Sequence, residues 1–153
     1  MVVKKTATTA KKTVTTAKKT TTSSTEISVT GNKKISTLQK DFNKKFPYLR
    51  LCIFYSYARK SVAKGEPITQ IDGDKTLASV RRVDSGGSIS ISGNKKVKSL
   101  EKEFDTVFGL YAQVCYTTDT GSRYYTSGDQ DEMTLSALNK WAEASDCKKG
   151  VWQ

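Results

Sequence analysis

The sequence predicts an α+β protein in which two tandem β-α-β-β-α repeats pack as a two-layer α/β sandwich after a disordered N-terminal tail. The first observation is internal: Ile27 to Phe42 aligns without a gap with Ile89 to Phe104 and keeps every apolar position. The second is compositional, because residues 1–25 contain no acidic and no aromatic residue. We therefore expect a tail over 1–25, a first repeat over 26–83 and a second repeat over 88–147, joined by a short linker that contains a glycine pair.

The tail repeats a seven-residue pattern in which a lysine pair precedes threonine and alanine. Its six lysines are Lys4, Lys5, Lys11, Lys12, Lys18 and Lys19. No position of the pattern carries a large apolar residue, so the tail cannot bury enough surface to offset its ordering entropy and should be disordered. In composition it resembles the Lys/Ala/Thr-rich tails of linker histones and some bacterial histone-like proteins, which implies contact with nucleic acid. A solubilising extension without a binding role is the alternative.

Each repeat begins with alternating apolar and hydroxyl residues, which is typical of a half-buried strand. A Gly-Asn pair ends each strand, and apolar residues with the spacing of an amphipathic helix follow. These helical residues are Ile35, Leu38, Phe42 and Phe46 in the first repeat and Val97, Leu100, Phe104 and Phe108 in the second. Pro47 and Gly109 are expected to end the two helices.

A second strand follows each helix, over residues 48–57 and 110–117, where aromatic and β-branched residues are frequent. A short third strand is expected near 68–71 and near 123–126, after a glycine-containing loop. Each repeat should then close with a helix that starts at a Thr-Leu pair, Thr76-Leu77 or Thr134-Leu135.

Composition restricts the function. The formal net charge is +11, and outside the tail the chain still holds 20 basic and 15 acidic residues. This balance favours anionic partners such as nucleic acid. The chain has no histidine, which removes the commonest general base near neutral pH and the usual imidazole metal ligand.

The cysteines give no sign of a metal site or of a disulfide framework. Cys52, Cys115 and Cys147 are an odd, widely spaced set without a CxxC motif. A reducing, cytoplasmic location is the simpler expectation. No segment approaches the roughly 20 apolar residues of a membrane span, and the paired acids before each closing helix are explained by capping. We therefore expect no enzyme activity, cofactor, metal, small-molecule substrate or membrane association.

The same four residues, Gly-Asn-Lys-Lys, stand at both strand-to-helix corners. Free backbone N–H groups at a helix start, together with adjacent ammonium groups, would make a phosphate-binding corner. The candidate phosphate-binding residues are Gly31, Asn32, Lys33, Lys34, Gly93, Asn94, Lys95 and Lys96. Ordinary helix capping by Asn with exposed lysines is the alternative explanation of this motif.

The second strands present a possible stacking face opposite their aliphatic face. It is formed by Tyr48, Arg50, Phe54 and Tyr111, which alternate along the strands in the manner of single-strand binders. The alternative is that a helix or a partner subunit covers this face.

These observations lead to two hypotheses. In the first, the protein is a small non-enzymatic nucleic-acid-binding protein that contacts DNA or RNA phosphates through its tail and its two corners. In the second, it is an interaction or assembly module that docks a protein partner, or a second copy of itself, through the aromatic sheet face or a free strand edge.

Overall fold

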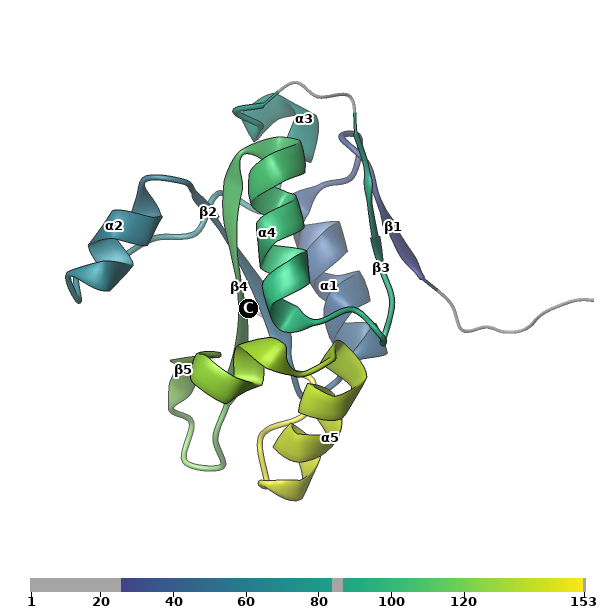
Figure 1. The fold of residues 1–153 in the computed structure, drawn as a ribbon, viewed down its shortest axis with the longest axis vertical. Helices are drawn as coiled ribbons and strands as arrows, with labels where there is room; N and C mark the ends of the chain where they lie inside the picture. Colours follow the sequence, from purple (N-terminus) through teal and green to yellow (C-terminus); the bar gives the residue numbers. More distant parts are fainter. Residues whose placement is uncertain (1–25, 84–86, 153) are drawn as a thin grey trace, which may run out of the picture.

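The structure is a computed structural model that describes residues 26–83 and 87–152, and it has an α+β fold with antiparallel sheets (Figure 1). The predicted tail, 1–25, lies outside the described residues. The strands are β1 (Ile27–Val29), β2 (Arg50–Tyr55), β3 (Ile89–Ile91), β4 (Leu110–Thr117) and β5 (Arg123–Tyr125). The helices are α1 (Ile35–Lys45), α2 (Ala58–Ala63), α3 (Leu77–Val80), α4 (Val97–Phe108) and α5 (Leu135–Ala144), with a 3-10 turn, η1, at Gly128–Glu132.

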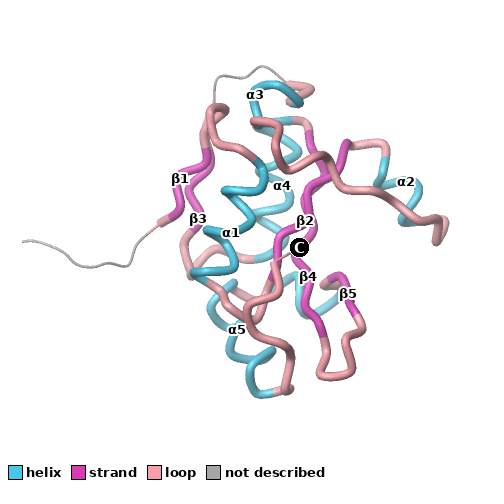
Figure 2. Tube along the Cα trace, turned by 180° about the vertical axis from the view of Figure 1, so that it is seen from behind, coloured by secondary structure: helices cyan, strands magenta, loops and turns pink. Residues whose placement is uncertain are grey.

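The strands form two antiparallel sheets, and each sheet contains strands from both halves of the chain. β1 pairs with β3, and the larger sheet has the order β2-β4-β5. α1 and α4 lie between these sheets when the molecule is seen from the front and from behind (Figure 2). The arrangement therefore has helices between two sheets, and it differs from the expected two layers.

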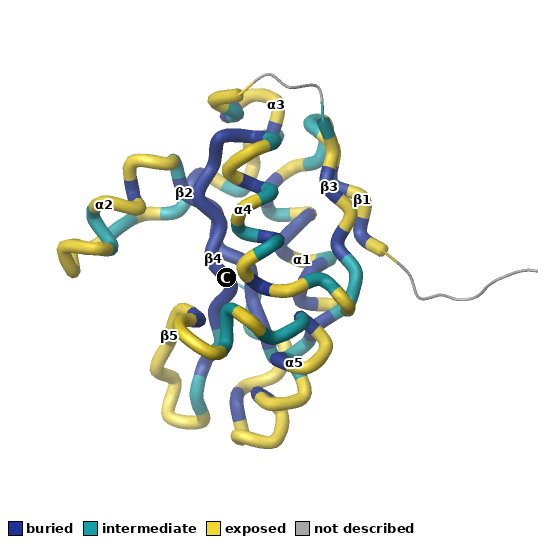
Figure 3. The backbone as a smooth tube through the Cα atoms, in the orientation of Figure 1, coloured by how far each residue is buried: buried dark blue, intermediate teal, exposed yellow. Residues whose placement is uncertain are grey.

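The apolar stripes of both helices meet in one core. The eight helical residues predicted to face inward are all buried, and they belong to a single cluster with the aliphatic residues of β2 and β4. Leu51 and Ile53 on β2 lie on the core side with Ala112 and Val114 on β4. Figure 3 shows this burial along β2 and β4, whereas α2 and the β5 hairpin are largely exposed.

Both closing helices begin at the predicted Thr-Leu pairs. Thr76 accepts a hydrogen bond from the Ser79 N–H, and Thr134 accepts one from the Ala137 N–H, each at 3.2 Å. These side chains satisfy donors that the first turn of a helix leaves free. None of the described helices combines the length and the apolar composition needed to cross a membrane.

The third strand is present in only one half. β5 lies where a strand was expected near 123–126, but residues 68–71 form no strand, and the unpredicted helix α2 precedes them. Polar side chains already occupy the outer edge of β2. Gln39 donates to the Leu51 carbonyl at 3.0 Å, and the Ile53 N–H donates to the Gln70 side chain at 3.2 Å. Only the Ile71 N–H, which donates to the Ile53 carbonyl, pairs there in the manner of a strand.

Gly109 ends α4 in a left-handed conformation, with φ of 65°. A Cβ at this position would lie 2.9 Å from Cγ2 of Val83. We expect Gly109→Ala to lower the free energy of unfolding by about 1–3 kcal/mol, because the backbone strain adds to this contact. Gly121→Ala is the matched control, since Gly121 has φ of 92° but no neighbour within 4 Å. Equal losses for the two variants in urea unfolding would show that the contact with Val83 contributes nothing.

Candidate functional site

The two Gly-Asn-Lys-Lys corners lie far from one another. Each follows the last residue of its strand, and β1 and β3 run antiparallel with Ser28 opposite Ser90. The corners are therefore at opposite ends of this small sheet, as Figure 1 also shows. They do not combine into one site.

Internal contacts occupy much of each corner. The Ile35 N–H at the start of α1 donates to the Lys75 carbonyl, and the Ser36 N–H donates to the Gly73 carbonyl. At the start of α4 the Val97 N–H donates to the Met133 carbonyl in the same way. Lys34 and Lys96, not the asparagines, are the N-cap residues, and neither has a side-chain cap. The closing segments thus already fill the places where a phosphate was expected to meet these N–H groups.

The lysines of the corners differ in their exposure. Lys33 forms an ion pair with Asp41 at 2.9 Å, and Lys95 forms one with Glu103. In each case the acid lies eight residues further along the chain, on the helix that follows the corner. Lys96 lies 3.7 Å from Glu132. Lys34 is exposed and forms no ion pair with any described residue. Of the predicted phosphate ligands, the second lysine of each corner is the more accessible.

The expected stacking face is buried. Arg50 is 1% exposed, Phe54 2% and Tyr111 9%, while Tyr48 is half-buried. Phe54 and Tyr111 belong to a second apolar cluster on the outer side of the large sheet, covered by Ala58 of α2 and by Val62 and Ile68. Phe54 and Tyr111 are therefore not accessible to a base in this structure, because α2 and the loop after it cover them.

Arg50 lies beside the two cysteines of this second cluster, on the same side of β2 and β4. We call Arg50, Cys52 and Cys115 the thiol cluster. The Cys52 and Cys115 sulfur atoms lie 3.1 Å apart across β2 and β4, and both side chains are buried. Arg50 is directly opposite Cys115 in the ladder. None of its three guanidinium nitrogens has a hydrogen-bond partner among the described residues.

The two thiols of this cluster differ in their acidity. The hydrogen bond from Cys115 lowers the pKa of Cys52, and the charges of Arg50 and Arg123 lower it further against the effect of burial. Burial raises the pKa of Cys115 well above its usual value, and the hydrogen bond to Cys52 raises it again. Cys52 is therefore the sulfur that carries negative charge when the pair loses one proton.

The exposed aromatic residues form two other groups. In the first, the Tyr55 and Tyr57 rings stack 5.9 Å apart at 15°, and the Arg82 guanidinium lies 4.7 Å from the Tyr55 ring centre. We call Tyr55, Tyr57 and Arg82 the tyrosine platform. In the second group, Tyr116 stacks on Tyr124 and meets Trp141 edge to face. Tyr57 is 70% exposed, the most exposed of the large apolar side chains.

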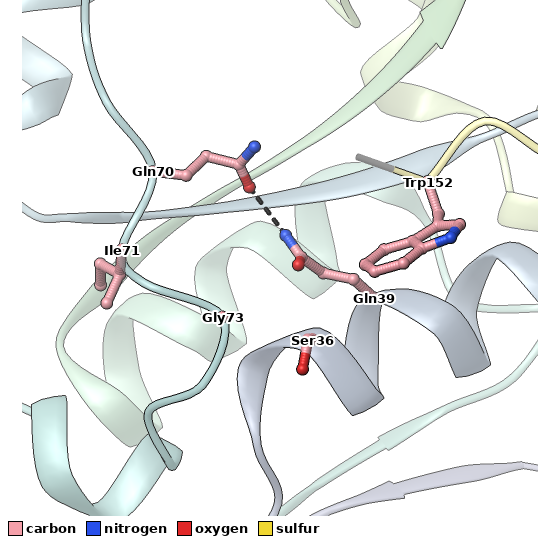
Figure 4. A pocket seen from close by; sticks show the side chains of 6 residues that line it. All are labelled: Ser36, Gln39, Gln70, Ile71, Gly73 and Trp152. Atoms are coloured by element: carbon pink, nitrogen blue, oxygen red, sulfur yellow. Dashed lines mark hydrogen bonds between the residues drawn. The ribbon is translucent and has the colours of Figure 1, made fainter.

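A small pocket of about 190 Å³ lies between α1 and the C-terminal segment, lined by Ser36, Gln39, Gln70, Ile71, Gly73 and Trp152 (Figure 4). None of the described residues that line it has a titratable side chain. Gln39 and Gln70 are hydrogen-bonded to each other at 2.7 Å, and both also bind the edge of β2. Their amides therefore form hydrogen bonds with the backbone at the edge of β2. The described residues that line the pocket offer no group for acid or base chemistry.

No match was found in comparisons with protein-family models, curated proteins or solved structures. The site has to be interpreted from its own geometry. Over residues 26–83 and 87–152, no three Cys, Asp or Glu side chains come together as possible metal ligands. What the surface does offer is aromatic rings beside cations.

The sequence did not single out the tyrosine platform. Tyr55 and Tyr57 were expected within a second strand that runs to residue 57, but β2 ends at Tyr55 and the chain turns into α2. The same turn exposes Tyr57 and covers Phe54. The signal that could have found it is the Ser56-Tyr57-Ala58 segment, where the apolar alternation of the strand stops.

Proposed function

We propose that this protein is a small non-enzymatic nucleic-acid-binding protein that stacks unpaired bases of DNA or RNA on the tyrosine platform. The observation that carries this proposal is the nearly parallel Tyr55–Tyr57 pair, in which Tyr57 is exposed and Tyr55 half-buried, with the Arg82 guanidinium beside the Tyr55 ring. Proteins that bind single strands combine aromatic rings, which accept any base, with cations that follow the backbone.

Further cations surround the platform. α2 begins directly after Tyr57 and carries Arg59 and Lys60, both exposed, and Lys64 follows at its end. Asp105 is the acidic neighbour, 3.7 Å from Arg59, and both side chains of that pair are about half exposed. A pair this exposed contributes little and is easily exchanged for a phosphate.

The lysine-rich tail and the two corners add electrostatic attraction in this proposal. Each phosphate that a lysine neutralises releases counterions, so the affinity depends on salt and not on sequence. The tail provides six such lysines. In the corners this role belongs to the exposed side chains of Lys34 and Lys96, together with Asn32 and Asn94, since the helix N–H groups are already bonded.

We also infer that the two halves are copies of one unit. Equivalent contacts support this: Lys33 pairs with Asp41 as Lys95 pairs with Glu103, and Lys34 bridges to Thr76 as Lys96 does to Thr134. The three cysteines, all free thiols in the structure, are compatible with the reducing cytoplasmic location that we propose.

Substitution of Tyr57 tests the function. In fluorescence-anisotropy titrations with a labelled single strand of mixed sequence, we expect Tyr57→Ala to weaken binding by about 1–3 kcal/mol, which is about five- to hundredfold, since a stacked base is lost. Tyr124→Ala is the matched control, because Tyr124 is also exposed and stacked but lies in the other aromatic group. It should bind as the unchanged protein does.

The salt dependence separates the two parts of the proposal. Replacing the six tail lysines by glutamine should flatten the slope of log K against log salt, whereas Tyr57→Ala should leave that slope unchanged. Equal affinity of the unchanged protein and Tyr57→Ala for the single strand, or a loss only with Tyr124→Ala, contradicts the platform as the binding site.

A second candidate function is a protein-interaction or assembly module. The second aromatic group favours it, because Tyr124 is 51% and Trp141 36% exposed beside Tyr116. Exposed clustered aromatic side chains are typical of interfaces. Sedimentation without nucleic acid tests this candidate: self-association that Trp141→Ala abolishes favours it, and a monomer at all concentrations rules out the homodimer.

A further inference from the structure

The thiol cluster has no role in the function proposed above. Its two sulfur atoms are 3.1 Å apart, the distance of a close S–H···S contact across neighbouring strands. The third cysteine, Cys147, lies apart from them in the main core, where burial raises its pKa. Packing alone does not require two cysteines and an arginine together in a second apolar cluster.

Arg50 makes the pair chemically unusual. A guanidinium without a hydrogen-bond partner in a buried site is costly unless an opposite charge lies near it. No carboxylate is hydrogen-bonded to it within the described residues. The two cysteines are beside it and can become anionic: Cys115 is opposite Arg50 in the ladder, and the charge of Arg50 acts on both thiols. A thiolate beside an arginine is also the activated form of cysteine.

We propose that Cys52 and Cys115 are a redox-active pair that a hydroperoxide, such as hydrogen peroxide, converts into an internal disulfide. The thiolate of Cys52 attacks one peroxide oxygen, the O–O bond breaks, and the products are Cys52 sulfenic acid and hydroxide. The Cys115 sulfur then attacks the Cys52 sulfur, and the S–O bond breaks. Together the two steps consume one peroxide, oxidise two sulfurs and release one water and one hydroxide. A dithiol reductant returns both cysteines to thiols by thiol–disulfide exchange and becomes a disulfide itself.

A surface pocket adjoins the side chains that cover the two cysteines. It has a volume of about 450 Å³ and is lined by Val62, Gly65, Glu66, Pro67, Ile68 and Tyr125. Val62 and Ile68 also pack against the second apolar cluster, which contains Cys52 and Cys115, and Tyr125 lies opposite Cys115 in the ladder. Side chains of α2, of the loop after it and of β5 thus lie between this pocket and the sulfurs.

The full-length protein with its three cysteines provides the first test. After treatment with hydrogen peroxide and alkylation of the remaining thiols, peptide mass spectrometry should find a Cys52–Cys115 disulfide, with Cys147 still alkylated. Dithiothreitol should restore all three thiols. The disulfide should form faster than glutathione is oxidised under the same conditions.

The second test uses Arg50→Met, which keeps the volume of the side chain in an apolar form that buried sites accept well. We expect disulfide formation in this variant to be about tenfold slower or more, because the thiolate fraction falls as the positive charge is removed. The pH profile should move to higher pH. The charged and titratable groups near Cys52 that remain are Cys115, Tyr111, Arg123 and Tyr125.

Cys147→Ser should react as the unchanged protein does. Oxidation slower than that of glutathione, a disulfide that includes Cys147, or a stable sulfinic acid on Cys52 without a disulfide overturns the proposal. An unchanged rate and pH profile in Arg50→Met overturns the role of the guanidinium.

Discussion

Replacing Phe104 by alanine is expected to lower the free energy of unfolding by about 3–5 kcal/mol. Phe104 is fully buried in α4 and its ring lies 5.8 Å from that of Phe108. The loss should affect the whole molecule and not one half, since the core cluster contains residues of both. Urea unfolding followed by circular dichroism and by tryptophan fluorescence measures it, and both signals should report one transition.

Phe42→Ala is the companion variant in the first half. Phe42 is as deeply buried as Phe104 and stands at the aligned position of α1. We expect a loss of similar size and again a single transition, because each helix contributes its stripe to the same core. Two separated transitions in either variant would contradict a shared core.

Glu101→Gln is expected to stabilise the protein by about 3 kcal/mol at pH 8 and to change little at pH 4. Burial, and after it the negative charge of Asp131, raise the pKa of Glu101 to about 7. The carboxylate of Glu101 accepts a hydrogen bond from the Val114 N–H at 3.4 Å, which a glutamine oxygen can replace. Urea titrations at the two pH values measure the difference.

The sign follows from where the proton is held. The pKa of Glu101 in the folded protein lies above its ordinary value of 4.5, so the folded state keeps the proton to higher pH than the unfolded state does. The contribution of Glu101 to stability is therefore greatest below about pH 4.5 and is lost as the pH rises to about 7. Stability of the unchanged protein that rises over this range, with the rise absent in Glu101→Gln, would contradict the assignment.

The other half contains the natural control. Gln39 holds the position in α1 that aligns with Glu101 in α4, and its amide nitrogen donates to the Leu51 carbonyl and to the Gln70 side chain. Gln39→Glu should destabilise at pH 8, since a carboxylate cannot donate to a carbonyl. The defect should shrink at pH 4, where the protonated acid regains one donor.

The sequence predicted the elements that periodicity determines. The strands at Ile27 and Ile89, the apolar stripes of α1 and α4 and the helix starts at Thr76 and Thr134 all appear in the structure. The inward face of the second strand was predicted equally well, because alternation decides which side chains face the helix.

The pairing of strands could not be predicted in this way. Alternation says which face of a strand is buried but not which other strand lies beside it, so the joining of β1 with β3 and of β2 with β4 had no local signal. The end of β2 at Tyr55 was missed as well, although the apolar alternation stops at Ser56, and this strand end determined where the site lies. Phe54 came to lie under α2 and the loop after it, while Tyr57 became exposed.

Ser28 pairs with Ser90, which is its equivalent in the alignment of the two halves. The residues on either side pair crosswise: Ile27 pairs with Ile91, the equivalent of Val29, and Val29 pairs with Ile89, the equivalent of Ile27. This is the contact that a two-fold symmetric dimer makes when one surface meets its own copy. A protein with one half alone would therefore find its missing strands in a second identical chain. Under the proposal that the two halves are copies of one unit, fusion of two such subunits end to end would give the present chain, and each half could then change separately, as at Gln39 and Glu101.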